Sequence, residues 1–129
     1  MGESVPGQCR HANGADLAAK RQNLGWTVVS CDDRHSWTSP VGTYTGNGFG
    51  LQDVLGNVWE WVQDCSNDSY NGAPGDGRAW ERGECGHRVV RGGSWIDEPA
   101  ALRAANRGRD SSDYRFNLLG LRIARTLAP

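Results

Sequence analysis

The chain has 129 residues, the size of one domain, and a formal net charge of −1. This balance excludes a strong overall field of the kind that attracts nucleic acid, and no apolar run is long enough for direct membrane insertion. Eighteen glycines, one methionine and 37% apolar residues predict a loop-rich α+β body with a small core. The six tryptophans therefore have to supply much of the buried surface.

The predicted elements are short. Residues 1–8 are expected to be a disordered or expression-derived segment ahead of one domain over 9–129. One helix is predicted over 11–22, capped by Asn13 with Asp16 in its first turn. Short strands are predicted over 26–29, 88–91 and 121–124, with a polar turn at 31–36 and an extended piece at 41–44. Turn glycines alternate with apolar residues over 49–61, and 66–86 is a long polar loop.

Four cysteines, Cys9, Cys31, Cys65 and Cys85, lack the spacing of a zinc site. An even number in a small chain favours two disulfides and an oxidising compartment, which implies an extracellular, periplasmic or cell-surface protein. Cys9–Cys31 with Cys65–Cys85 is the most local of the three connectivities, and each loop would stabilise the fold by roughly 3 kcal/mol. Four buried free thiols are the alternative. The polar N-terminus shows no signal peptide.

Charge and pattern change in the last third of the chain. Residues 88–129 hold eight arginines and four acidic residues, a local balance of +4. These arginines are expected to pair with backbone carbonyls and carboxylates, and a basic binding surface is the alternative. The motifs Arg-Val-Val-Arg-Gly-Gly-Ser-Trp (88–95) and Gly-Leu-Arg-Ile-Ala (120–124) enclose a segment with no clear period.

Together with Gly-Leu-Gln-Asp-Val-Leu-Gly-Asn-Val-Trp-Glu-Trp (50–61), these motifs resemble the formylglycine-generating enzyme (sulfatase-modifying factor) family. The resemblance runs from about Cys9 to Arg125 and implies a C-type-lectin-like fold with little regular secondary structure. It matches the C-terminal half or so of a usual family domain. The chain is therefore either a compact variant, or the remainder is a missing N-terminal half or a second chain.

The resemblance also implies structural calcium, because oxygen donors around tight glycine turns suit a hard cation. One expected set has the side chains of Asp53, Asn57 and Glu60 with carbonyls from Leu55, Gly56 or Val58. The other has the side chains of Asn13 and Asp33 with the carbonyls of Gly14 and His35. The alternative for the first set is a turn in which Asn57 and Glu60 satisfy backbone amides.

Catalytic members of the family oxidise a substrate cysteine with a copper-bound cysteine pair that follows the Gly-Gly-Ser motif. The matching interval here, 95–107, contains no cysteine. Carboxylate or alanine cannot replace thiolates toward Cu(I), so copper is not expected and no catalytic residue is assigned. A copper-dependent oxidase acting on sulfatase cysteines is kept as the alternative function.

A second resemblance, to variable proteins of diversity-generating retroelements, predicts a non-catalytic ligand-binding module. In such proteins, fixed residues alternate with variable positions whose codons are mutated at adenines. Segment 95–119 has this arrangement of fixed and variable positions. The positions expected to contact an unknown protein or small ligand are Ile96, Asp97, Glu98, Ala100, Ala101, Gly108, Asp110, Ser111, Tyr114, Phe116, Asn117 and Leu118. All except Glu98 are reachable from an asparagine codon by adenine changes alone. The alternative is an ordinary non-catalytic family domain in which Phe116 and Leu118 belong to the core.

Overall fold

The computed structural model describes residues 7–125, and residues 1–6 and 126–129 lie outside the described part. Most of the described chain is irregular, which confirms the loop-rich α+β prediction. The regular elements are α1 (Gln8–His11), α2 (Leu17–Lys20), β1 (Trp59–Ser66), β2 (Glu84–Arg91), β3 (Gly108–Ser111) and β4 (Leu119–Leu121). Of the expected N-terminal segment 1–8, only Gly7 and Gln8 are described, and Gln8 begins α1 and is buried.

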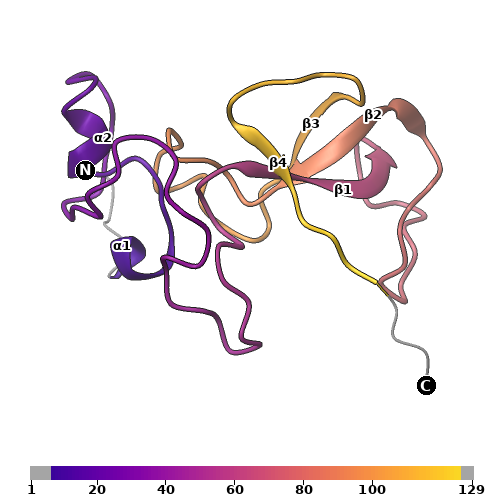
Figure 1. Ribbon diagram of the computed structural model, residues 1–129. Helices are drawn as coiled ribbons and strands as arrows, with labels where there is room; N and C mark the ends of the chain where they lie inside the picture. Colours follow the sequence, from indigo (N-terminus) through magenta and orange to yellow (C-terminus); the bar gives the residue numbers. More distant parts are fainter. Residues whose placement is uncertain (1–6, 126–129) are drawn as a thin grey trace.

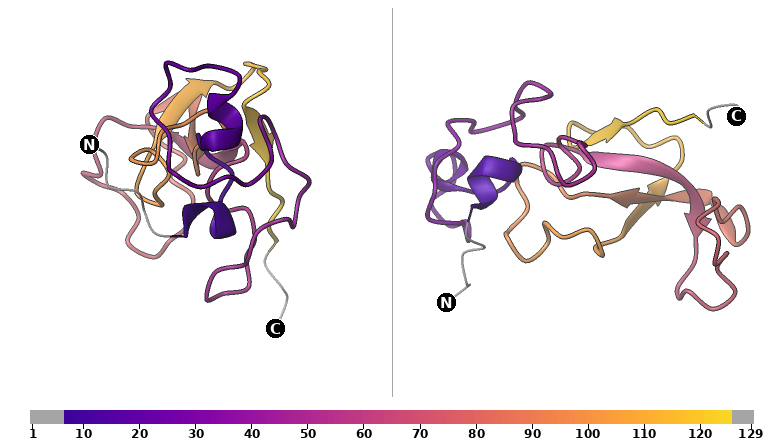
Figure 2. Two further views of the ribbon diagram at one scale, coloured as in Figure 1. Left: turned by 90° about the vertical axis from the view of Figure 1, so that its left-hand side faces the viewer. Right: turned by 90° about the horizontal axis from the view of Figure 1, so that it is seen from below.

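The four strands form one sheet in the order β3-β2-β1-β4. β2 is antiparallel to both β1 and β3, whereas β4 runs parallel to β1. Figures 1 and 2 place both helices at one end of the molecule and the sheet at the other. The predicted strand over 88–91 is the second half of β2. The strand predicted over 121–124 is displaced toward the N-terminus, because Trp59 pairs with Leu119 and thereby fixes where β4 begins.

The helix predicted over 11–22 is wrong in its bounds and its cap. α2 is limited to four residues and is capped by Asp16, whose Oδ1 accepts a hydrogen bond from the Ala19 N–H at 3.0 Å. Asn13 instead forms an isolated parallel bridge with Gly56, and this contact draws its backbone out of the helix. The strand predicted over 26–29 is not formed. The piece at 41–44 turns at Gly42, whose φ is +78°.

The core is small and joins the helical end to the sheet. It consists of Ala12, Ala15, Ala18, Ala19, Val29, Tyr44, Cys65, Val89, Val90, Trp95 and Leu102. Alanines dominate the helical end because the short helices pack closely against the neighbouring loops. Trp59 and Trp61 are half-buried on β1. The core fixes the loops that carry the candidate sites.

Two disulfides tie the irregular segments to the regular ones. Cys9–Cys31 joins α1 to a loop 22 residues away, and Cys65–Cys85 joins β1 to β2 across the long polar loop. This is the most local connectivity, as predicted, and the alternative of free thiols is wrong since all four cysteines are bonded. The disulfides indicate an oxidising compartment. Within residues 7–125, no helix has the length and apolarity needed to cross a membrane.

Candidate functional site

Three segments meet at the turn Gly56–Asn57. The Asn57 N–H donates to the Asn13 carbonyl at 2.7 Å, and the Trp95 N–H donates to the Asn57 carbonyl at 3.0 Å. Gly56 has a φ of +75°, and a Cβ there would collide with the Asn13 carbonyl oxygen. The Asn57 side chain accepts from the Ser39 N–H at 3.0 Å and donates to the Ser39 carbonyl at 3.2 Å. The Asn57 carboxamide therefore satisfies backbone groups, as in the alternative to calcium ligation.

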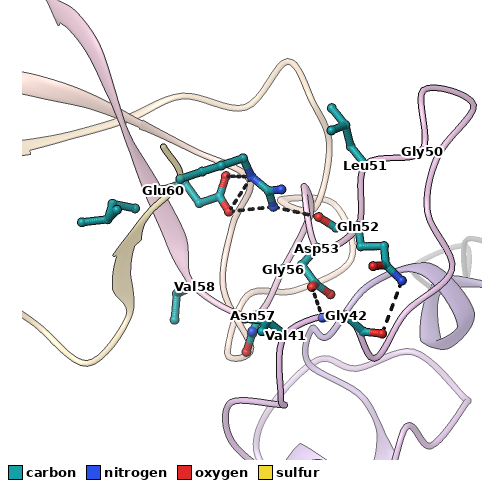
Figure 3. Close-up of a pocket in the computed structure, with 12 residues that line it drawn as sticks. Val41, Gly42, Gly50, Leu51, Gln52, Asp53, Gly56, Asn57, Val58 and Glu60 are labelled. Carbon is teal, nitrogen blue, oxygen red and sulfur yellow. Dashed lines mark hydrogen bonds and ion pairs between the residues drawn. The ribbon is translucent and has the colours of Figure 1, made fainter. Parts of the chain in front are cut away.

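The first expected calcium set lies around a cavity of about 520 Å³, here called the Glu60 cleft (Figure 3). Its lining comprises Val41, Gly42, Gly50, Leu51, Gln52, Asp53, Gly56, Asn57, Val58, Glu60, Leu121 and Arg122. Leu55, the remaining residue of the expected set, is half-buried in the same turn.

The carboxylates in the Glu60 cleft face different partners. Glu60 pairs with Arg122 at 3.1 Å, and this contact raises the pKa of the Arg122 guanidinium. Asp53 accepts from the Gly42 N–H at 2.6 Å, and Figure 3 shows it directed toward Gly42. Its other oxygen, Oδ1, is buried and has no hydrogen-bond partner among the described residues. The set shares one cleft, but its side chains do not converge on one point.

Asp33 of the second expected set belongs to an acidic cluster that includes two residues not predicted from the sequence as ligands. Carboxylate oxygens of Asp16, Asp32 and Asp33 lie within 4.8 Å of one another and can hold a metal ion. Asp33 accepts from the Tyr44 hydroxyl at 2.6 Å and from the His35 N–H at 2.8 Å. The adjacent pair of aspartates after Cys31 was the sequence signal for this cluster.

Burial sets the electrostatics of this cluster. Desolvation raises the pKa of Asp33, and desolvation with the hydrogen bond to Asp33 raises the pKa of Tyr44. Asp32 differs because its hydrogen bond to Arg21 lowers its pKa. The Asn13 Oδ1 is buried without a hydrogen-bond partner among the described residues. The three carboxylates of the cluster fit a hard cation, which would offset the cost of an ionised, half-buried Asp33.

A third feature is a cavity of about 260 Å³, here called the tryptophan cleft. Its lining comprises Gln22, Asn23, Trp26, Trp37, Trp95, Ile96, Phe116, Asn117 and Leu118. The buried Trp95 ring packs edge-on against Trp37 at 4.8 Å and tilts against Trp26 at 6.1 Å. Trp37 and Phe116 remain 54% and 53% exposed. The alternative that Phe116 is a core residue is therefore wrong, whereas Leu118 is half-buried.

Four of the predicted ligand positions, Ile96, Phe116, Asn117 and Leu118, line the tryptophan cleft. Tyr114 extends this group because its ring stacks on that of Phe116 at 6.0 Å between centroids. Trp26 and Trp37 were not predicted as cleft residues, because large aromatic side chains in so small a chain are first expected to be buried. Both lie in the loops between α2 and β1, Trp26 half-buried and Trp37 exposed.

The other predicted ligand positions do not line this cleft. Asp97 accepts from the N–H and hydroxyl of Ser94 at 2.7 and 2.6 Å, so its carboxylate holds the turn after Trp95. Glu98 and Ala100 are exposed in that turn, and Ala101 is half-buried. Gly108, Asp110 and Ser111 lie on β3. The single surface expected over 95–119 is thus divided into a cleft, a turn and an edge strand.

The arginines fasten this segment to the scaffold, as predicted. Arg91 donates to the carbonyls of Ala104 and Asn106 at 3.2 and 3.3 Å and to the Tyr70 hydroxyl at 2.8 Å. Arg107 donates to the Asn67 carbonyl at 3.1 Å, and its guanidinium lies 4.4 Å from the centre of the Tyr70 ring. These contacts hold the segment between Trp95 and β3 without regular secondary structure.

Comparison with known proteins places these features in context. A model of the sulfatase-modifying factor enzyme 1-like domain matches residues 8–127. The formylglycine-generating enzyme of Streptomyces coelicolor is 34% identical over 108 residues, which are 75% of this chain and 32% of that protein.

Two solved structures are also similar. The match to PvdO from Pseudomonas aeruginosa has a TM-score of 0.71 and 36% identity, covering 88% of this chain and 38% of that one. The match to Treponema denticola variable protein 1 has a TM-score of 0.59 and 31% identity, covering 84% and 38%. The chain thus spans about a third of the length of these relatives, which include an enzyme and a variable protein.

Proposed function

Because the chain belongs to the sulfatase-modifying factor enzyme 1-like family, we propose that it is a non-catalytic member that binds a ligand in the tryptophan cleft. The convergence of residues from distant segments carries this proposal. Ile96 follows the Gly-Gly-Ser-Trp motif, Phe116 and Leu118 precede β4, and all three line the same cavity as Trp26 and Trp37. In such a cleft, the residues at the contact positions can vary while the scaffold that holds them stays the same.

The lining of the tryptophan cleft defines the chemistry of its ligand. Three indole rings and Phe116 offer apolar faces, and the amides of Gln22, Asn23 and Asn117 offer hydrogen bonds. Among residues 7–125, none of those that line the cleft is charged. The cleft therefore suits a neutral group with an apolar face and polar edges, presented by a small molecule or by a protein.

The cysteines support binding over oxidation. The oxidase mechanism needs a pair of thiolates to hold Cu(I), whereas all four cysteines of this chain are in disulfides. The interval expected to carry the pair is instead a turn held by Asp97 and Ser94. Copper-dependent oxidation of sulfatase cysteines is the less supported function.

The similarity to a variable protein supports a diversified origin for the cleft residues, with a paralogous binding domain as the other origin. The neighbouring DNA decides between them. Diversification requires a near-copy of the 3′ coding end that differs at adenines, together with a reverse transcriptase. If both are absent, the domain is a paralogue with fixed cleft residues.

The proposal also includes a structural calcium ion and a place outside the cytosol. Calcium is assigned to Asn13 and Asp33, with the carbonyls of Gly14 and His35, because the Asn13 Oδ1 is buried without a hydrogen-bond partner among residues 7–125. The disulfides support an extracellular, periplasmic or cell-surface location.

A screen of neutral aromatic, aliphatic and saccharide fragments against the ¹⁵N-labelled chain tests the binding function. Hits should shift the indole N–H resonances of Trp26 and Trp37, and Trp37→Ala should abolish those shifts. Trp80→Phe, outside the cleft, is the matched control. Hits confined to other surfaces would refute the cleft. Copper binding together with conversion of a cysteine-containing sulfatase peptide to formylglycine would establish the oxidase instead.

A further inference from the structure

The two disulfides differ in the charged groups beside them. Cys65 of β1 lies opposite Arg88 of β2, and the Arg88 Nη1 lies 3.4 Å from the Cys65 Sγ. At the other disulfide the neighbour is a carboxylate, since the Asp16 Oδ2 lies 3.6 Å from the Cys9 Sγ. A positive charge stabilises a thiolate, and a negative charge opposes it. The surroundings of Cys65 therefore favour opening of its disulfide with the electron pair on Cys65.

Arg88 is held in place beside this sulfur. The register of β1 on β2 is irregular between Trp61 and Cys65. The Arg88 Nη1 also donates to the Gln63 carbonyl of this irregular stretch at 2.6 Å, so the backbone of β1 positions the guanidinium. An arginine keeps its charge at any physiological pH. Its contact with Cys65 would strengthen once that sulfur is anionic, because hydrogen bonds to ionised acceptors are the stronger ones.

Burial decides which of the two sulfurs a thiol can reach. Cys65 is completely buried, with 0% of its surface exposed. Cys85 is only half-buried, and its neighbours Glu84 and Gly86 are exposed. An incoming thiolate can therefore approach Cys85, which makes Cys65 the leaving sulfur. Thiol–disulfide exchange is faster when the leaving sulfur is more stable as a thiolate, and Arg88 lies on that side of the bond.

We propose that Cys85 is a thiolation site for low-molecular-weight thiols. The attacking thiolate forms a new S–S bond with the Cys85 Sγ, the Cys65–Cys85 bond breaks, and its electron pair leaves on the Cys65 Sγ beside Arg88. The attacking sulfur is oxidised and Cys65 is reduced, so the step needs no further oxidant. The reaction does not depend on the ligand of the tryptophan cleft.

The Cys65–Cys85 bond closes a loop that supports residues 104–109. This loop joins β1 to β2 at the end of the sheet away from the helices (Figure 1). The Arg107 guanidinium lies 4.4 Å from the centre of the Tyr70 ring in the loop. Asp68, also in the loop, pairs with Arg109 at 3.1 Å. Opening the bond should therefore loosen residues 104–109, so thiolation would regulate the mobility of that segment.

Reduction of the folded full chain by dithiothreitol, an uncharged dithiol, tests the role of Arg88. Acid-quenched samples are alkylated and mapped by mass spectrometry, and the rate of opening is expressed relative to Cys9–Cys31 in the same sample. This ratio corrects for any general loosening of the fold. Arg88→Met should lower the ratio about fivefold, and Arg88→Lys, which keeps the charge, should retain most of it. Arg125→Met removes a charge from another exposed position and should leave the ratio unchanged.

A monothiol shows which sulfur is attacked. After brief exposure to β-mercaptoethanol and an acid quench, peptide mapping should place the added thiol on Cys85. In the Cys65→Ser/Cys85→Ser variant, amide exchange over 104–109 should be faster than in the parent. An equal ratio in the parent and Arg88→Met, the added thiol on Cys65, or unchanged exchange over 104–109 would overturn the proposal.

Discussion

The backbone N–H of Asn57 donates to the carbonyl of Asn13 at 2.7 Å, across 44 positions in the sequence. This contact joins the segment between the two helices to the turn that leads into β1. It explains why Asn13 does not cap a helix and why position 56 needs glycine. The same turn then receives Trp95, so the walls of both clefts depend on this junction.

Replacing Asn57 by alanine should destabilise the fold by about 2–4 kcal/mol, because the buried Ser39 N–H and carbonyl lose their partner. Urea unfolding followed by tryptophan fluorescence measures the change. Asn71→Ala, in an exposed loop, should stay within about 0.5 kcal/mol of the parent. Equal stability of the two variants would contradict the central role of the junction.

Removing the Cys65–Cys85 disulfide by the double substitution to serine should lower the free energy of unfolding by roughly 3 kcal/mol. The loop it closes would gain freedom in the unfolded chain. Removing Cys9–Cys31 should have a similar effect, since the sequence separations are 20 and 22. Denaturant titration checks both, and a reduced parent protein as stable as the oxidised one would contradict this account.

Calcium should raise the melting temperature, and chelation should lower it, because an ion held only by the native state stabilises that state. At about 100 times its dissociation constant, the ion would add about 2.7 kcal/mol. Asp33→Ala should abolish the response, whereas Asp53→Ala should keep it. If Asp53→Ala alone removes the response, the ion belongs in the Glu60 cleft.

Arg91→Lys should loosen residues 104–106 although it keeps the charge. The guanidinium contacts the three carbonyls of that segment and the Tyr70 hydroxyl together, which an ammonium cannot do in the same geometry. Faster amide exchange over 104–107 in the lysine variant, with unchanged exchange in β1, is the expected result. Arg103→Lys serves as the control, because the Arg103 side chain donates to the Ala100 carbonyl within its own turn.

The sequence by itself identified the family and showed that no cysteine pair follows the Gly-Gly-Ser motif, whereas for the disulfides it only favoured the most local of three connectivities. Each of these follows from residue types at fixed spacing along the chain. The extent of the helices and the start of β4 did not follow from it. Asn13 and Leu119 take their conformations from Gly56 and Trp59, with which they pair across the chain, and local propensity cannot anticipate such pairing.

The same distinction applies to the sites. The sequence predicted Ile96 and Phe116 as contact residues, but the cavity that they line together with Trp26 and Trp37 depends on loops that only tertiary packing positions. Asp97 was also predicted to contact a ligand. Its carboxylate instead accepts two hydrogen bonds from Ser94, so it holds the turn of the scaffold. In a chain with so little regular structure, long-range hydrogen bonds rather than periodicity decide which side chains remain free to bind.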